Sequence, residues 1–354
     1  MSNKGQINYF LTLLVTILLL VVSFNLQAQD EEKPTIPLDH FYAKPINNNG
    51  FRKILSKLHF TFETGYGRTF YNQDLSDFNL LQQQDSLPLI FGKDLNITGG
   101  NVTTGYNYFL NEVNTTENTS FGGNDFLINS DTTDLGFKGR GTSIPLTLMI
   151  HVEFDRYQIG GGATFEYHSI GTFNPTSFSD QISSYDPNFN STFYKKYFVT
   201  LGAKVYRYRE YVLAADARIG AFNLSNRFDR SVIQKGVFVN IGATLRRELS
   251  EYFSVFARPS FDFKNFTVNL PESSLSVNTS MNAFYIGIGA TYRIPELKRC
   301  FIKSCGVQVN HQHGNMEYRS RKHPFYKKQN PHHGENYPRL IKYKRKNRKK
   351  LNPY

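Results

Sequence analysis

Tryptophan is absent from this sequence of 354 residues, and cysteine occurs only twice. Hydrophobic residues make up 40% of the chain and the mean hydropathy is −0.43, which argues against a protein built from membrane-spanning helices. No cysteine stands directly after the apolar stretch near the N-terminus, which excludes a lipoprotein signal. Aromatic residues are abundant instead, with 31 Phe and 22 Tyr, and this enrichment favours β-strands.

The N-terminal segment 1–28 has the pattern of an export signal. Lys4 gives it a positive start, "YFLTLLVTILLLVVSFNL" is an apolar core, and "LQAQ" offers a small-residue cleavage site after Ala28. The core is also long enough to be a membrane anchor, which is the alternative interpretation. We expect an exported chain that starts at Gln29 and continues as an extended, polar segment to residue 57.

Residues 58–294 contain eight runs in which apolar and polar residues alternate, the pattern of half-buried strands. The joins between the runs alternate between tight turns and long polar segments. Such alternation is typical of an outer-membrane barrel with turns at one end and loops at the other. The longest join, 71–140, includes a stretch at 95–110 that is a candidate for an outer hairpin extending the wall. The runs are 58–70, 141–154, 156–169, 193–207, 210–224, 235–249, 251–268 and 281–294.

One face of these runs is apolar, whereas the other carries charged residues and glycines. In a soluble sandwich the charged face would lie in water. Three features favour the opposite arrangement, in which the apolar face is outside and the charged face lines a barrel. Aromatic residues lie near the ends of the runs, and the runs are longer than the roughly 9–11 residues that cross a bilayer. The charged face also mixes both signs, which suits a narrow interior. We therefore predict an all-β fold, an eight-stranded antiparallel transmembrane β-barrel with a basic, largely irregular C-terminal tail. The predicted interior charge cluster is Glu63, Glu166, Lys204, Asp216, Arg218, Arg246, Arg258 and Asp262.

The last run reads "FYIGIGATYRIP", in which Gly289 is followed at the third and fifth positions by Tyr292 and Ile294. This pattern is similar to the terminal-strand signal of outer-membrane barrels, and residues 58–294 resemble the small eight-stranded barrels of the OmpA/OmpX-like superfamily. The resemblance implies a location in the cell outer membrane, outward-facing loops, and periplasmic segments at 29–57 and 295–354. Accessory proteins of gliding and type IX secretion systems offer an analogy for a barrel with a periplasmic extension.

Catalysis is not predicted. A barrel of eight strands is just wide enough to be filled by its own side chains, so we interpret the interior charges as structural filling. The alternatives are a narrow transport or ligand-binding barrel and a surface adhesin built as a β-sandwich. His151 and His168 lie near acidic residues, but no motif positions a nucleophile beside them. We expect a protein that is not an enzyme and has no cofactor.

Cys300 and Cys305 follow the last run closely and are separated by four residues. In an oxidising periplasm such a pair favours a local disulfide, which is our prediction. His311 and His313 come next and complete the pattern C-x4-C-x5-H-x-H. These four residues are also able to bind Zn²⁺ tetrahedrally, but the spacing is unusual and a disulfide removes two ligands, so no metal is predicted.

The C-terminal tail carries the charge of the protein. Residues 298–354 hold 16 Lys and Arg against two acidic residues, a net charge of +14, which leaves −2 for the rest of the chain. This composition cannot bury a core, so we expect an extended tail. The export signal argues against a nucleic acid and for an anionic periplasmic partner, a protein or peptidoglycan, beside the lipid bilayer of the outer membrane. We predict an envelope anchor or assembly subunit, with binding residues Arg319, Arg321, Lys322, Lys327, Lys328, Lys344, Arg345 and Lys346.

Overall fold

The structure is a computed structural model that describes residues 50–93, 97–98, 100–107, 110–129, 134–154, 156–271, 274–314 and 316–329. The predicted export signal and the binding residues Lys344, Arg345 and Lys346 lie outside the described residues. Within those residues, no helix is long and apolar enough to cross a membrane. The segment predicted to be extended up to residue 57 ends in a short helix, α2 (Gly50–Leu55), which is a correction.

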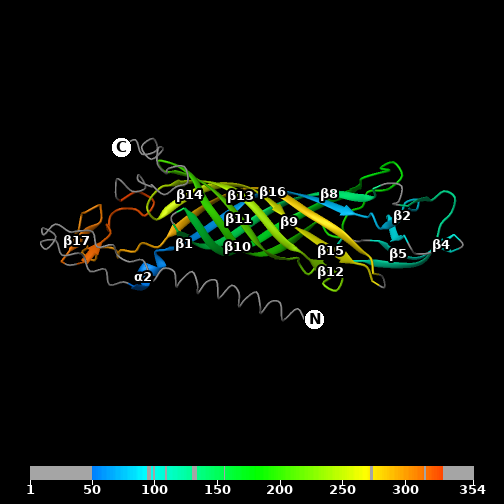
Figure 1. The fold of residues 1–354 in the computed structure, drawn as a ribbon, viewed down its shortest axis with the longest axis horizontal. Coiled ribbons are helices and arrows are strands. Elements are labelled where there is room, and N and C mark those ends of the chain that lie inside the picture. The colour runs from blue at the N-terminus through cyan, green and yellow to red at the C-terminus, as the bar shows by residue number, and fades with distance from the viewer. Residues whose placement is uncertain are drawn as a thin grey trace. The chain divides into compact units, whose positions relative to one another are not determined.

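All eight predicted runs form strands of one antiparallel sheet (Figure 1). The first strand pairs on both sides: His59 lies opposite His151 of the second run and opposite Arg293 of the last. Hydrogen bonding therefore returns to its starting strand, and we call these eight strands the closed sheet. They are β1 (Leu58–Asp74), β8 (Gly136–Phe154), β9 (Tyr157–Pro175), β10 (Ser191–Tyr208), β11 (Tyr211–Asn223), β13 (Val237–Glu248), β14 (Phe253–Phe263) and β16 (Ser276–Arg293).

The sheet contains ten strands among the described residues, two more than predicted. β12 (Ile233–Lys235) precedes β13, with Gly236 between them, and β15 (Asn265–Asn269) follows β14 after Lys264. β15 pairs with the start of β16, and β12 pairs with β15. Each added strand thus continues a strand of the closed sheet past a one-residue break, on the side of the long joins.

The short turns and the two flanking segments lie at the same end of the closed sheet. Within the closed sheet, the joins that follow β8, β10 and β13 are two to four residues long. Because His59 pairs with Arg293, the chain enters β1 and leaves β16 at this end, which we call the turn end. Figure 1 shows α2 there, and β2, β4 and β5 beyond the opposite end, the loop end.

The long join between β1 and β8 folds into a sheet of its own instead of remaining a polar loop. The described strands within 95–110 pair inside this second sheet, so this candidate hairpin is not part of the wall. The reason is a set of apolar residues, among them Leu80, Ile90 and Tyr106, each at most 1% exposed. The strands are β2 (Phe78–Gln82), β3 (Leu89–Gly92), β4 (Ile97–Thr98), β5 (Asn101–Asn107), β6 (Asn114–Ser120) and β7 (Phe126–Asn129).

The C-terminal region is folded as far as residue 329. It contains two short strands, β17 (His311–His313) and β18 (Met316–Tyr318), which form a two-stranded sheet. The backbone N–H of Gln329 donates to both carboxylate oxygens of Glu251, at 3.1 Å each, in the turn between β13 and β14. The prediction of an extended tail is therefore wrong for this part.

Candidate functional site

The outer face of the closed sheet is apolar. Leu201 and Ile241 are 51% and 55% exposed, whereas the charged residues that alternate with such positions are buried. A soluble protein rarely exposes a contiguous apolar surface of this kind, because it would associate or aggregate in water. The apolar side chains therefore face outward and the charged side chains face inward, as predicted from the sequence. The exposed apolar residues include Phe62, Tyr66, Phe70, Ile144, Leu146, Leu148, Ile150, Ile159, Phe165, Leu213, Ile219, Leu245, Phe261, Ile286 and Ile288.

This apolar surface has the height of a membrane. On β9, Tyr157 and Tyr167 both face outward, ten residues apart, with Ile159 and Phe165 between them. At about 3.3 Å per residue and the usual tilt, these tyrosines lie about 25 Å apart along the barrel axis, the height of an outer-membrane apolar band. On β8 the outward residue that follows Ile144 towards the loop end is the polar Thr142, so this strand continues beyond the apolar band.

The inner face holds the predicted interior charge cluster, and all eight of its members are at most 7% exposed. Its centre is a network that spans the interior from β1 to β11 and β14. The Arg258 guanidinium donates to Asp216 at 2.5 Å and lies 3.8 Å from Glu63, and Arg218 donates to Glu63 at 2.5 Å. Two carboxylates and two guanidiniums thus neutralise one another away from water.

A second network lies nearer the loop end. The Lys196 ammonium group lies 2.5 Å from a Glu166 oxygen and 2.6 Å from an Asp262 oxygen. Lys264 lies 3.2 Å from Asp262, and the Tyr285 hydroxyl donates to Glu166 at 2.6 Å. Lys264 was not among the predicted cluster residues. It lies two residues after Asp262 and also faces inward, although the strand is broken at this residue.

A third group of ion pairs lies near the turn end. Glu153 accepts from Lys204 and Arg246, each at 2.5 Å, which places these two predicted residues in one network. Arg207 and Glu248 form a further pair at 2.5 Å. The interior is therefore crossed by ion pairs at three levels.

Glycines on the inner face make room for these side chains. A Cβ atom on Gly242 would lie 2.5 Å from the Arg258 guanidinium, and one on Gly287 would lie 2.6 Å from a Glu63 carboxylate oxygen. The glycines that the sequence places among the charges are thus a condition for packing long charged side chains into a narrow interior.

A serine, a histidine and a glutamate meet inside the closed sheet. Ser143 Oγ lies 2.6 Å from His168 Nδ1, and Glu166 Oε1 lies 3.5 Å from the same nitrogen. Sequence reasoning missed Ser143, because it comes close to His168 only through the pairing of β8 with β9. All three side chains are 0% exposed, and Ser143 also bonds with Thr69 at 3.1 Å. The arrangement is thus a packed hydrogen-bond network with no surface open to a substrate.

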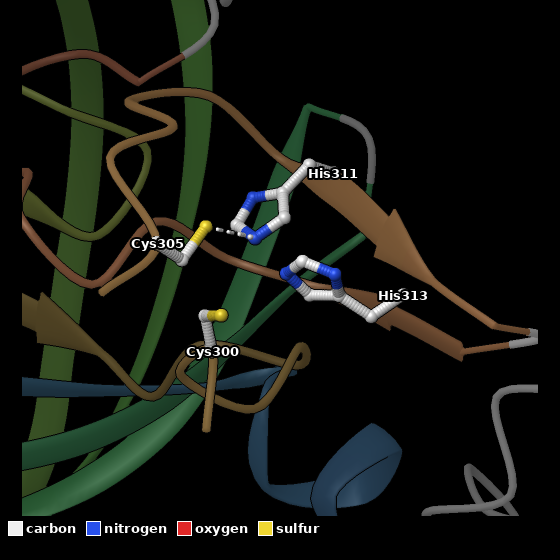
Figure 2. Close-up of side chains that lie close together, drawn as sticks. All are labelled: Cys300, Cys305, His311 and His313. Atoms are coloured by element: carbon white, nitrogen blue, oxygen red, sulfur yellow. Dashed lines mark hydrogen bonds between the residues drawn. The ribbon is translucent and has the colours of Figure 1, made fainter. Parts of the chain in front are cut away.

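Cys300 and Cys305 are free thiols in the structure, so the predicted disulfide is not formed. Figure 2 shows both cysteines facing His311 and His313, which extend from β17. The sulfur of Cys305 contacts His311 Nε2 at 3.3 Å. Both thiols lie close to the two imidazoles, which is the arrangement that the alternative Zn²⁺ interpretation requires.

The tail residues predicted to bind a partner fall into two groups. Arg319 and Arg321 make internal contacts: Arg321 donates to the Cys300 carbonyl at 3.0 Å, and Arg319 bridges to the backbone of Arg299. Burial lowers the pKa of Arg319, and Arg299 acts in the same direction. Lys322 and Lys327 are exposed, and Lys328 is half-buried.

An aromatic contact holds the tail to the turn end. The Phe325 ring packs edge-on against Phe253 and Tyr292, with ring centres 5.5 and 5.9 Å away. The Phe325 carbonyl also accepts a hydrogen bond from Ser250 in the β13–β14 turn. These contacts present the exposed lysines at a defined place on the turn end.

No family model matches the sequence, and no curated protein matches it. Solved structures do match. The outer membrane protease OmpT from Escherichia coli is 11% identical, with 67% of this chain and 96% of that chain covered and a TM-score of 0.30. The outer membrane protein AlkL in lipid bilayers is 11% identical, with 66% and 89% covered and a TM-score of 0.31. The β-domain of the Bordetella autotransporter BrkA is 9% identical, with 65% and 98% covered and a TM-score of 0.21.

The first two of these structures carry an outer-membrane description. Their TM-scores are too low to carry an argument. The assignment to the outer membrane therefore rests on the exposed apolar face of the closed sheet, whose eight strands pair in a ring, since lipid tolerates only helices and closed barrels.

The loop end of the interior is closed by a hydrophobic core. Phe228, which is 3% exposed, packs against Phe189, Tyr194 and Phe266, with ring centres 5.4 to 5.9 Å away. Two polar cavities inside the closed sheet have volumes of about 20 and 30 Å³, each large enough for one or two water molecules. Among the described residues, ion pairs and the aromatic cluster around Phe228 thus fill much of the interior.

Proposed function

We propose that the chain is an integral outer-membrane β-barrel of eight spanning strands that is not an enzyme and acts as an envelope anchor or assembly subunit. The observation that carries this proposal is the closed sheet with an apolar exterior and an interior filled by ion pairs. Such an interior leaves the two ends as the surfaces for interaction. A role in a secretion or gliding complex stays a prediction.

The turn end is the proposed binding surface, and its partner is an anionic periplasmic protein or peptidoglycan. Lys322 and Lys327 are exposed beside the docked Phe325, and the chain continues into residues 330–354, which hold eight Lys and Arg against one acidic residue. A rigid docked segment followed by a basic chain favours a partner with clustered carboxylates, because opposite charges raise both the encounter rate and the specificity.

Deleting residues 298–354 is expected to remove the partner from the protein. Crosslinking in cells, followed by purification of the barrel, should recover the partner at least about tenfold less than with the full chain, because about 14 net positive charges are lost. Binding to the full chain should also weaken as salt is raised, since salt screens exposed charges.

A matched control replaces the basic residues of the tail with glutamine and keeps its length. Heat-modifiable migration on gels shows in each variant that the barrel has still assembled. Survival of every crosslinked partner in both variants would contradict the anchor role and leave the barrel assignment standing.

The transport alternative predicts an open interior. Reconstituted in planar lipid bilayers, the full chain is expected to show no stable conductance, because ion pairs cross the interior at three levels and an aromatic core closes the loop end. An open porin added to the same bilayers verifies that single steps are detectable. Stable steps from the purified chain would favour a transport barrel over the proposed anchor.

A further inference from the structure

The four side chains shown in Figure 2 bring together a complete set of metal-binding atoms. One ligand atom from each of Cys300, Cys305, His311 and His313 lies within 4.8 Å of the other three. In a tetrahedral zinc site, metal–ligand distances of 2.0–2.3 Å correspond to ligand–ligand separations of about 3.3–3.8 Å. The Cys305 sulfur and His311 Nε2 are already 3.3 Å apart, and binding an ion requires the more distant ligand atoms to approach by at most about 1 Å.

The local backbone explains why these atoms converge. His311 and His313 are two residues apart on β17, so their side chains leave the same face of the strand. The Cys305 N–H donates to the Ile302 carbonyl at 3.2 Å, in a turn that brings its sulfur back towards β17. Cys300 is buried, and its N–H donates to the Arg319 carbonyl at 3.0 Å, which fixes it beneath the other ligands.

The histidines are oriented as metal ligands are. His311 Nδ1 lies 3.0 Å from the Val309 carbonyl, which accepts its proton and leaves Nε2 with a free lone pair facing Cys305. This outer hydrogen bond to a backbone carbonyl is the usual way of setting the tautomer of a ligating histidine. His313 Nε2 is buried and has no hydrogen-bond partner in the described part of the chain. An ion at the centre of the four atoms supplies that partner.

We propose that Cys300, Cys305, His311 and His313 form a structural Zn²⁺ site that locks the base of the tail. The two thiols lose their protons to solvent on binding, and two thiolates with two neutral imidazoles give a neutral site around a divalent ion. Thiolate and imidazole together select zinc over Mg²⁺ or Ca²⁺, which prefer oxygen ligands. Four protein ligands leave no open position, so the site is structural and not catalytic.

The ion has a mechanical consequence for the tail. Arg319 and Arg321 both hydrogen-bond to the backbone around Cys300, and the docked Phe325 follows four residues later. Zinc would link the segment that follows β16, which carries the two cysteines, to β17, which carries the two histidines. It would thereby fix the course of the chain towards the turn end. A second group of potential ligands, His59, His151 and Glu153, is not proposed as a site, because Lys204 and Arg246 already neutralise Glu153.

The test measures the zinc content and the number of reactive thiols of the full chain. The chain is purified in detergent while accessible free thiols are blocked. We expect about one Zn²⁺ per chain by elemental analysis, and two thiols that react with a thiol reagent only after a chelator is added. Replacing zinc with Co²⁺ should give the visible absorption bands of tetrahedral thiolate cobalt.

His313→Asn and Cys300→Ser are each expected to lower the bound zinc at least about tenfold, whereas the matched variant His323→Asn keeps it. Heat-modifiable migration confirms that every variant contains a folded barrel. A Cys300–Cys305 disulfide found by mass spectrometry would overturn the proposal. A folded, reduced chain that binds neither Zn²⁺ nor Co²⁺ would also overturn it. Either result leaves the anchor role intact, because the deletion experiment tests that role separately.

Discussion

Replacing Arg258 with leucine is expected to lower the free energy of unfolding by about 3–5 kcal/mol, the usual cost of breaking a buried ion pair from one side. Arg258 is 2% exposed, and its guanidinium donates to Asp216 at 2.5 Å and to the Asn240 side-chain oxygen at 2.6 Å. Without it, Arg218 is the remaining described side chain within ion-pair distance of both Asp216 and Glu63. Urea unfolding of the protein folded into lipid vesicles measures the loss.

The double variant Arg258→Leu/Asp216→Leu separates charge from packing. It removes one positive and one negative charge and keeps the Glu63–Arg218 pair, so the central network stays neutral. Replacing a whole buried pair with apolar residues is often neutral, so the double variant should regain more than half of the stability lost by Arg258→Leu. If it is less stable than Arg258→Leu, shape and not charge balance governs this position.

Replacing Ile241 with arginine is expected to destabilise the protein by about 2–4 kcal/mol in lipid vesicles, the cost of a cation at the bilayer midplane. Ile241 is the middle residue of the outward apolar series of β13, which runs from Val237 to Leu245. On a soluble protein the same substitution at a half-exposed position changes stability by about 0.5 kcal/mol or less. The measurement is again unfolding from vesicles, compared with the parent chain.

Thr142→Arg is the matched control for this substitution. Thr142 also faces outward and is exposed, but it lies above the apolar band, so the arginine reaches water. Its effect should stay within about 0.5 kcal/mol. Equal costs at Ile241 and Thr142 would show that no lipid contacts the apolar face and would remove the basis of the outer-membrane assignment.

The barrel strands were predictable because their signal is local. Side chains alternate between the two faces of a strand, so a run of ten or more residues shows both faces directly in the sequence. Long strands average out local exceptions, and all eight runs exist in the structure. The break at Lys264 escaped prediction because a single residue that leaves the ladder does not interrupt the alternation there.

The pairs inside the barrel were not predictable. Glu63 and Arg218 are 155 residues apart in the chain and meet because strand pairing and tilt place them at one level of the interior. Ser143 and His168 meet through the register of two neighbouring strands. The sequence indicated which charges face inward, but a shift of two residues in any register would change their partners and leave the alternation intact.

The sequence by itself determined the all-β class, the eight runs that form strands, the inward face and the basic charge of the C-terminal region, since each follows from composition or from a period of two. Only the tertiary structure decided that the long join folds into a second sheet, that the tail docks through Phe325, and that Cys300 and Cys305 face two histidines instead of each other. These features depend on contacts between segments far apart in the chain, and such contacts leave no periodic trace in the sequence.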